Sequence, residues 1–260
     1  MCLDVIKKSL QIECDALAAL IGRIGPEAVQ AVRIIMECKG QVIVTGMGKA
    51  GLVGRKIAAT LASTGTPAFF LHAAEAIHGD LGIVSPKDVV LALSNSGESE
   101  EIVSLLPHLK RFDVKIIALT SRKESTLGRY SDVVLDTTVP QEAEPLDIAP
   151  TASTTVQMAM GDALAAALVH ERGFTRDQYA VFHPGGALGK KLLWTVADLM
   201  HKDGAIPLVP ENTSFNDAIL SMTSFRLGAI FVVDAAGLLK GIITDGDLRR
   251  IFQRTKDPWE

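Results

Sequence analysis

The sequence has few cysteines and little net charge, and each shortage excludes a class of protein. Only three of its 260 residues are cysteines, at positions 2, 14 and 38, an odd number confined to the N-terminal region. Such a set does not suit a disulfide framework, so the sequence predicts a reducing compartment, the cytoplasm. The net charge of −4 comes from interspersed acids and bases, without the basic stripe of a nucleic-acid-binding protein. We therefore expect no nucleic-acid partner.

Long uncharged hydrophobic runs are also missing. Charged residues at positions 4, 7, 8 and 13 interrupt the N-terminal apolar residues, so we expect no signal peptide. The least charged stretch, 148–170, contains a hydroxyl cluster at 151–155 as well as Asp162, which argues against a membrane span. The sequence therefore predicts no membrane partner.

Aromatic residues make up only 5% of the chain, whereas 48% of it is hydrophobic, so the core is built mainly from aliphatic side chains. Short apolar runs alternate with helical patterns, which predicts an α/β fold with a doubly wound, five-stranded parallel sheet over residues 1–193. The expected strands are 41–45, 67–71, 89–93, 115–119 and 133–136. Helical patterns cover 3–21, 26–38 and 153–172. The last is apolar all round, so we expect it to be buried, either within the chain or in a subunit interface.

The composition changes after Leu193, and residues 194–260 read as a separate small α+β unit. Its expected elements are a helix at 214–224, strands at 229–233 and 239–243, and a helix at 245–253. A unit of this size buries little core, and alone it would expose an apolar face, so we expect it to need a partner. The residues expected on that face are Ile230, Val232, Ile242 and Ile243.

The most informative motif is the turn Ser94–Ser99, which joins an apolar strand to a helix. One serine there would be read as an ordinary N-cap. Three serines around one glycine exceed what a cap requires. Hydroxyls and free backbone N–H groups at a helix N-terminus suit a phosphate, so the turn predicts a phosphorylated small-molecule ligand.

Several other polar residues follow strands or lie in rigid turns. Lys49 lies among three glycines after the first strand, and we interpret this turn as part of a phosphate or enolate site and not as a nucleotide loop. The histidines at 72 and 78 give only a weak metal signal, and we favour His78 near the substrate and His72 in the structure. His183 lies in a turn rich in proline and glycine, which is uncommon for a surface histidine. Glu142, in a proline-bracketed loop after the fifth strand, would alone pass as a solvated acid.

Together these segments resemble a known family. The turn SNSGES at 94–99 resembles the phosphate-binding signature of sugar isomerase (SIS) domains. A wider set of segments is similar to the arabinose-5-phosphate isomerase family of Gram-negative bacteria: GMGK at 46–49, the stretch 78–82, APTASTT at 149–155 and HPGGALGKKLL at 183–193. Residues 228–249 resemble a cystathionine-β-synthase (CBS) repeat; the family normally carries two such repeats, and this chain has one.

The resemblance implies the reversible isomerisation of D-ribulose 5-phosphate to D-arabinose 5-phosphate through a cis-enediol, supplying 3-deoxy-D-manno-octulosonate for lipopolysaccharide or capsule. It also implies roles for individual positions. The phosphate is expected to be held by Ser94, Asn95, Ser96 and Ser99. Lys49 would stabilise negative charge on the substrate, and Glu101 would orient the sugar. Glu142 is the first choice for the base, His183 is its competitor or a ring-opening and proton-shuttling group, and His78 is a further member of the site.

The resemblance further implies a homotetramer, a dimer of dimers, in which His183 could complete a neighbouring subunit's site. No cofactor and no metal are expected. The CBS unit could bind an adenosyl nucleotide through Asp245 and Asp247, but capping of the following helix by these two acids is the simpler interpretation.

Two alternatives remain for the function. One is another phosphosugar isomerase on the same scaffold, such as a hexose 6-phosphate isomerase. The other is a SIS protein that senses a sugar phosphate without turnover. Such regulators carry a basic helix-turn-helix, whereas residues 1–38 have no clustered basic face.

Overall fold

The computed structural model describes residues 2–186, 189–191 and 194–254. The chain divides into two compact units, Met1–Leu193 and Trp194–Glu260. Within the described ranges, no helix combines the length and the apolarity that crossing a membrane requires.

The first unit is built on a five-stranded sheet with the strand order β2-β1-β3-β4-β5, and every neighbouring pair is parallel. Its strands are β1 (Val42–Gly46), β2 (Ala68–His72), β3 (Val89–Leu93), β4 (Lys115–Thr120) and β5 (Val133–Asp136). The predicted doubly wound parallel sheet is therefore confirmed, with each strand within one residue of its expected bounds. All residues of β1 and β3 are buried, as central parallel strands covered on both faces require.

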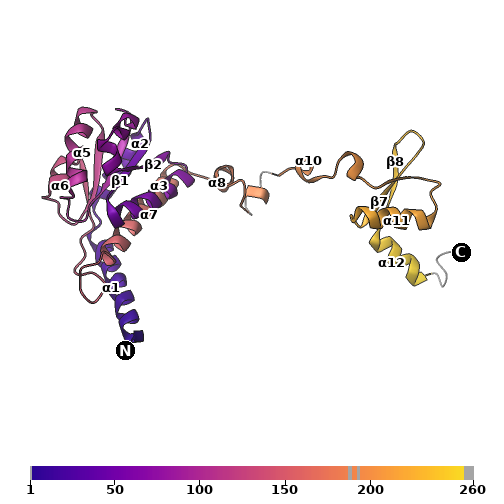
Figure 1. Cartoon of the computed structure of the whole chain (residues 1–260), viewed down its shortest axis with the longest axis horizontal. Helices are drawn as coiled ribbons and strands as arrows, with labels where there is room; N and C mark the ends of the chain where they lie inside the picture. Colours follow the sequence, from indigo (N-terminus) through magenta and orange to yellow (C-terminus); the bar gives the residue numbers. More distant parts are fainter. Residues whose placement is uncertain (1, 187–188, 192–193, 255–260) are drawn as a thin grey trace. The chain divides into compact units, whose positions relative to one another are not determined.

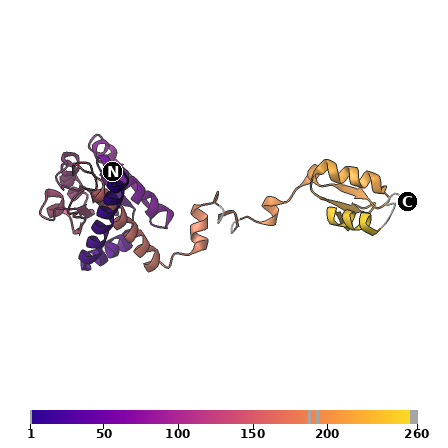
Figure 2. The same ribbon diagram turned by 90° about the horizontal axis from the view of Figure 1, so that it is seen from below.

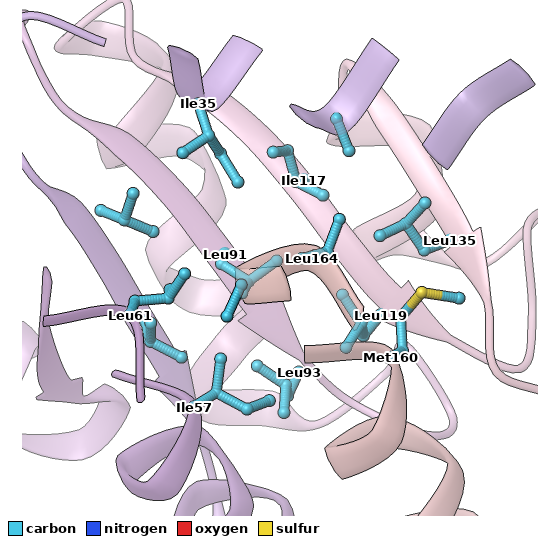
Figure 3. Close-up of a cluster of buried hydrophobic side chains, with 14 of the residues drawn as sticks. Ile35, Ile57, Leu61, Leu91, Leu93, Ile117, Leu119, Leu135, Met160 and Leu164 are labelled. Atoms are coloured by element: carbon cyan, nitrogen blue, oxygen red, sulfur yellow. The ribbon is translucent and has the colours of Figure 1, made fainter. Parts of the chain in front are cut away.

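Helices cover both faces of this sheet, and Figure 1 shows α5 and α6 on one side of it and α3 and α7 on the other. One face packs against α1 (Cys2–Arg23), α2 (Pro26–Glu37), α3 (Gly48–Ser63) and α7 (Ala152–Glu171). The other face packs against α4 (Ala73–Ile77), α5 (Glu100–Arg111) and α6 (Thr126–Tyr130). The first core interleaves side chains of alternate strand positions with those of the helices, including Leu91, Leu93, Ile117 and Met160 (Figure 3). The unit also contains the 3-10 turn η1 (Asp80–Ile83) and the helix α8 (Arg176–Phe182).

Helix α7 is buried on one side within the single chain. It packs against α1, α2 and α3 and leaves Met158, Ala163 and Ala166 exposed. Lys56 of α3 pairs with Asp162 on this helix. Burial of the exposed side in a subunit interface stays a prediction.

The second unit has a three-stranded sheet in the order β6-β7-β8, with β6 parallel and β8 antiparallel to β7. Its elements are α10 (Val196–Leu199), η2 (Asp203–Ala205), β6 (Leu208–Pro210), α11 (Phe215–Phe225), β7 (Ala229–Val233), β8 (Leu239–Thr244) and α12 (Asp245–Arg254). Figure 2 shows α11 and α12 alongside these strands. The expectation that Ile230, Val232 and Ile243 lie on an exposed face is wrong, because Ile230 is fully buried in a core with Met222 of α11 and the other two pack against this core. Ile242 of β8 is 53% exposed on the opposite face. The small core and this exposed face agree with a unit that can pair with a partner.

Candidate functional site

The carboxyl edge of the first sheet brings two predicted segments together. Gly46, the last residue of β1, is in register with Leu93, the last residue of the neighbouring β3. Lys49, exposed in the first turn of α3, and the turn Ser94–Ser99 therefore follow adjacent strands. Ligands of open α/β sheets bind at this edge.

The turn Ser94–Ser99, called the serine loop below, is fixed by its own hydroxyls. The buried Ser94 Oγ accepts a hydrogen bond from Gly97 N at 3.1 Å and lies 2.9 Å from Ser99 Oγ. Ser96 Oγ accepts from Glu98 N at 3.2 Å. The buried Ser94 side chain therefore fixes the shape of the loop, while Asn95 and Ser96 are exposed to solvent.

A second hydroxyl-rich segment, after β4, anchors the serine loop. Ser121 donates to the Asn95 carbonyl from its backbone N at 3.0 Å and from its Oγ at 2.7 Å. Thr126 N donates to the Glu98 carboxylate at 2.7 Å, and this hydrogen bond holds the pKa of Glu98 below its usual value. Residues 120–126 were missed by the sequence interpretation. The sequence did offer a signal for this segment, because several hydroxyl residues follow β4, the strand next to the one that leads into the serine loop.

The backbone N–H groups in the first turn of α5 are not capped by the N-cap side chain. Ser99 occupies the N-cap position, but its side chain makes no capping hydrogen bond to the helix. The N–H groups of the first turn point out of a helix N-terminus, where the positive end of the macrodipole lies. The exposed Ser96 hydroxyl and these N–H groups are donors of the kind that bind phosphate, and Lys49 follows the adjacent strand.

The turn before Lys49 depends on close backbone packing. A Cβ on Gly51 would lie 2.8 Å from the Gly46 carbonyl oxygen, and Gly48 has a φ of +54°. Gly46, Gly48 and Gly51 follow the spacing G-x-G-x-x-G of dinucleotide-binding loops, so the spacing by itself does not exclude a nucleotide loop. The glycines bring the backbone of the strand end close to the start of α3.

Glu142 is half-buried in the loop that follows β5, and its carboxylate is held by the N-terminus of α7. Its Oε2 accepts hydrogen bonds from Thr151 N at 2.8 Å, Thr151 Oγ1 at 3.1 Å and Ser153 N at 3.1 Å. Partial burial acts to raise the pKa of Glu142, but hydrogen bonds from Ser153 and Thr151 outweigh it and hold the pKa below the usual value. The side chain is therefore an ionised carboxylate at neutral pH.

The remaining predicted site residues of the first unit lie on three separate elements. Glu101 is half-buried in the first turn of α5, next to the serine loop. His78 is exposed at the C-cap of α4. His183 is at the C-cap of α8, where its Nδ1 lies 3.0 Å from the Tyr179 carbonyl oxygen and its ring stacks on the Tyr179 ring at 3.9 Å. In the described part of the chain, Glu142 and His183 bond within their own neighbourhoods and not to the serine loop.

In the second unit, Asp247 has a structural function. Its Oδ2 accepts hydrogen bonds from Thr244 N at 2.9 Å and Thr244 Oγ1 at 2.7 Å, and its other carboxylate oxygen pairs with Arg250 at 2.5 Å. These contacts, with the Thr244 hydroxyl first, lower the pKa of Asp247 to about 2. Asp245 begins α12, and its backbone N bonds to the Gly228 carbonyl at 3.0 Å. Neither residue is joined to a metal cluster, since no group of three His, Cys, Asp or Glu side chains suited to a metal gathers among the described residues.

Comparisons with known proteins match both units. The SIS domain family matches residues 34–167, and the CBS domain family matches residues 196–254. The chain is 53% identical to arabinose 5-phosphate isomerase KdsD of Yersinia pestis over 95% of its own length and 75% of that protein. It is 52% identical to KdsD of Escherichia coli K12 over 96% of its length and 76% of that protein.

A solved structure adds to this similarity. The protein c3406 of E. coli CFT073, solved in complex with arabinose 5-phosphate, has a TM-score of 0.68 and 41% identity, covering 70% of this chain and 97% of that chain. Identity above 50% over nearly the whole sequence, with both domain types in order, confirms the resemblance drawn from the motifs. The chain therefore belongs to the arabinose 5-phosphate isomerase family, with a SIS domain followed by a CBS domain.

Proposed function

We propose that the chain interconverts D-ribulose 5-phosphate and D-arabinose 5-phosphate. The observation that carries this proposal is the serine loop at the sheet edge, where exposed hydroxyl, amide and N–H groups lie beside the strand end that presents Lys49. Such a surface suits the phosphate of a small substrate. Relatives named arabinose 5-phosphate isomerase and a similar structure in complex with arabinose 5-phosphate favour this sugar phosphate over others.

The proposed chemistry moves one proton between C1 and C2 of the open-chain sugar through a cis-enediol. Glu142 takes the proton from one carbon and returns it to the other, which a carboxylate ionised at neutral pH can do. Lys49 stabilises the negative charge that forms on the enediol oxygens. The phosphate, gripped by Asn95, Ser96 and Ser99 on a loop that the buried Ser94 shapes, supplies binding energy that positions the reacting carbons.

The other predicted residues complete this proposal. Glu101 orients the sugar from the first turn of α5, with His78 as a further contact. His183 assists ring opening or proton transfer, and we propose that it does so in the site of a neighbouring subunit of a homotetramer. Its position in a turn outside the sheet supports this assignment. The reaction needs no redox cofactor, because the substrate and the product are isomers.

We also propose that residues 1–193 form the isomerase domain and residues 194–260 a CBS repeat. An adenosyl nucleotide at the CBS repeat would have to contact Asp245 or Asp247. The capping contacts of Asp247 favour the structural interpretation for that residue.

Initial rates with two substrates test the proposed function. We expect turnover of D-ribulose 5-phosphate and little or none of D-fructose 6-phosphate. Preference for the hexose would identify a different phosphosugar isomerase. Saturable binding of either sugar phosphate without turnover would identify a sensor, and either result would overturn the proposal.

A further inference from the structure

The N-terminus of α7 is capped from outside the helix. A threonine at the N-cap usually accepts a hydrogen bond from the N–H group two or three residues later. Thr151 occupies this position, but its side chain makes no such bond. The Ser153 N–H, two residues later, donates instead to Glu142 Oε2. The carboxylate of the proposed base has therefore taken the place of the usual cap.

The Thr151 hydroxyl is free to hold the loop that carries this carboxylate. Its oxygen accepts a hydrogen bond from Ala143 N at 2.7 Å and donates its proton to Glu142 Oε2 at 3.1 Å. One side chain thus fixes both the backbone directly after Glu142 and an oxygen of the Glu142 carboxylate. Ser9 of α1 holds the same loop from another side by donating to the Ala143 carbonyl at 2.7 Å.

Three hydrogen bonds hold one oxygen of the carboxylate, and the buried Ser153 side chain also acts to lower the pKa of Glu142. Thr151 N, Thr151 Oγ1 and Ser153 N converge on Oε2, whereas no hydrogen bond reaches Oε1 from the residues described. Glu142 also lines a cavity of about 240 Å³ between its loop and α1. A carboxylate gripped by one oxygen and open at the other presents a single atom, Oε1, in a fixed direction.

We infer that Thr151 is a positioning residue whose hydroxyl fixes Glu142 Oε2, so that Oε1 is the atom that accepts the substrate proton. The inference rests on the proposed function, since it assumes that Glu142 is the base. The hydroxyl stabilises the ionised carboxylate by charge-assisted hydrogen bonding, so its removal is expected to shift the protonation of Glu142 as well as its geometry.

The experiment compares three substitutions in the full-length chain by steady-state kinetics with D-ribulose 5-phosphate across the acidic pH range. T151V removes the hydroxyl and keeps the branched shape, and T151S keeps the hydroxyl. T154V is the matched control, because Thr154 lies in the same helical turn and its hydroxyl donates to the Thr151 carbonyl at 2.8 Å without touching Glu142. T151A replaces T151V if the valine variant does not fold.

We expect T151V to lower kcat by about 10- to 100-fold and to move the acidic limb of the kcat profile to higher pH. The kcat of T151S should stay within about 2-fold of that of the unsubstituted chain. T154V should keep the pH profile of kcat. A lower kcat of T151V without a shift of the acidic limb would show a merely structural role and overturn the inference. A T151V protein with unchanged kcat and pH profile would overturn it too. An unsubstituted chain without isomerase activity would instead refute the proposed function.

Discussion

Gly97 of the serine loop lies directly against Ser125 of the neighbouring segment: a Cβ built on Gly97 would lie 2.0 Å from Ser125 Oγ. Gly97 also has a φ of +68°, in the left-handed region that side chains disfavour. The Gly97 carbonyl in turn accepts from Leu127 N at 3.1 Å. The serine loop is therefore held in place by a contact that only glycine permits.

We expect Gly97→Ala to displace the serine loop and to raise KM. The left-handed backbone alone costs about 1–2 kcal/mol of unfolding free energy, and the clash with Ser125 adds to it. Chemical denaturation and steady-state kinetics measure the two effects. Gly82→Ala is the control, because a Cβ there has open space. A Gly97→Ala protein with unchanged stability and KM would contradict the role given to this contact.

Substitutions at the two sides of the sheet edge should separate binding from turnover. We expect Ser96→Ala to raise KM by about tenfold or more, because a hydrogen bond to a charged phosphate is lost. We expect Lys49→Ala mainly to lower kcat, by about 100-fold, because charge stabilisation acts in the transition state.

Lys56→Ala serves as the control for the lysine, since Lys56 lies on the same helix and pairs with Asp162 on the surface. It should leave both constants near those of the unsubstituted chain. An unchanged KM in Ser96→Ala would remove the phosphate assignment from this serine.

Glu142→Gln should nearly abolish isomerisation while the loop stays folded. The amide oxygen of glutamine can still accept the hydrogen bonds of Thr151 and Ser153, but it cannot take up the substrate proton. A general base contributes about 10²- to 10⁴-fold, so solvent deuterium exchange at C1 or C2 of the substrate should fall by a similar factor. Glu144→Gln is the control, since the Glu144 carboxylate accepts from the backbone N–H groups of Leu146, Ile148 and Ala149 in its own loop.

His183→Asn should also nearly abolish turnover. If Glu142→Gln still exchanges the proton at the normal rate while His183→Asn does not, His183 is the base. That result would contradict the mechanism proposed above.

Asp247 should make the CBS unit sensitive to acid. A carboxyl whose folded pKa is depressed stabilises the fold above its unfolded pKa, and this stabilisation disappears as the pH falls through the folded pKa. For Asp247 the loss is expected between pH 3.8 and about 2. Asp247→Asn should be less stable at neutral pH and should lose less stability over this interval.

Tryptophan fluorescence during denaturation can follow this unit, because both tryptophans of the sequence, at positions 194 and 259, belong to it. Asp203→Asn, at an exposed turn of the same unit, is the control. Equal acid sensitivity of Asp247→Asn and the unsubstituted chain would contradict the capping role.

The strands of the first unit could be predicted closely because buried parallel strands are continuous apolar runs ended by polar turns. β6 was missed because it is only three residues long, follows Pro207 and ends at Pro210. The exposed side of α7, which includes Met158, Ala163 and Ala166, could not be located from the sequence because this helix has no clear polar face.

The serine loop and Lys49 could be placed at one edge from the sequence because both follow strands of a parallel sheet. The contacts around Glu142 could not be predicted from the sequence. Thr151 is nine residues further along the chain and contacts Glu142 only when the loop folds back onto α7. The burial of Ile230 was also mispredicted. It shares the face of β7 that α11 covers, which depends on the packing of a helix and not on the strand itself.

Incubating the unsubstituted chain with D-ribulose 5-phosphate in D₂O and identifying the product by NMR tests the central claim most directly. The account predicts D-arabinose 5-phosphate, with deuterium at C2 where the enediol intermediate exchanges its proton with solvent. Ribose 5-phosphate or xylulose 5-phosphate as the product, or an unchanged substrate, would contradict it.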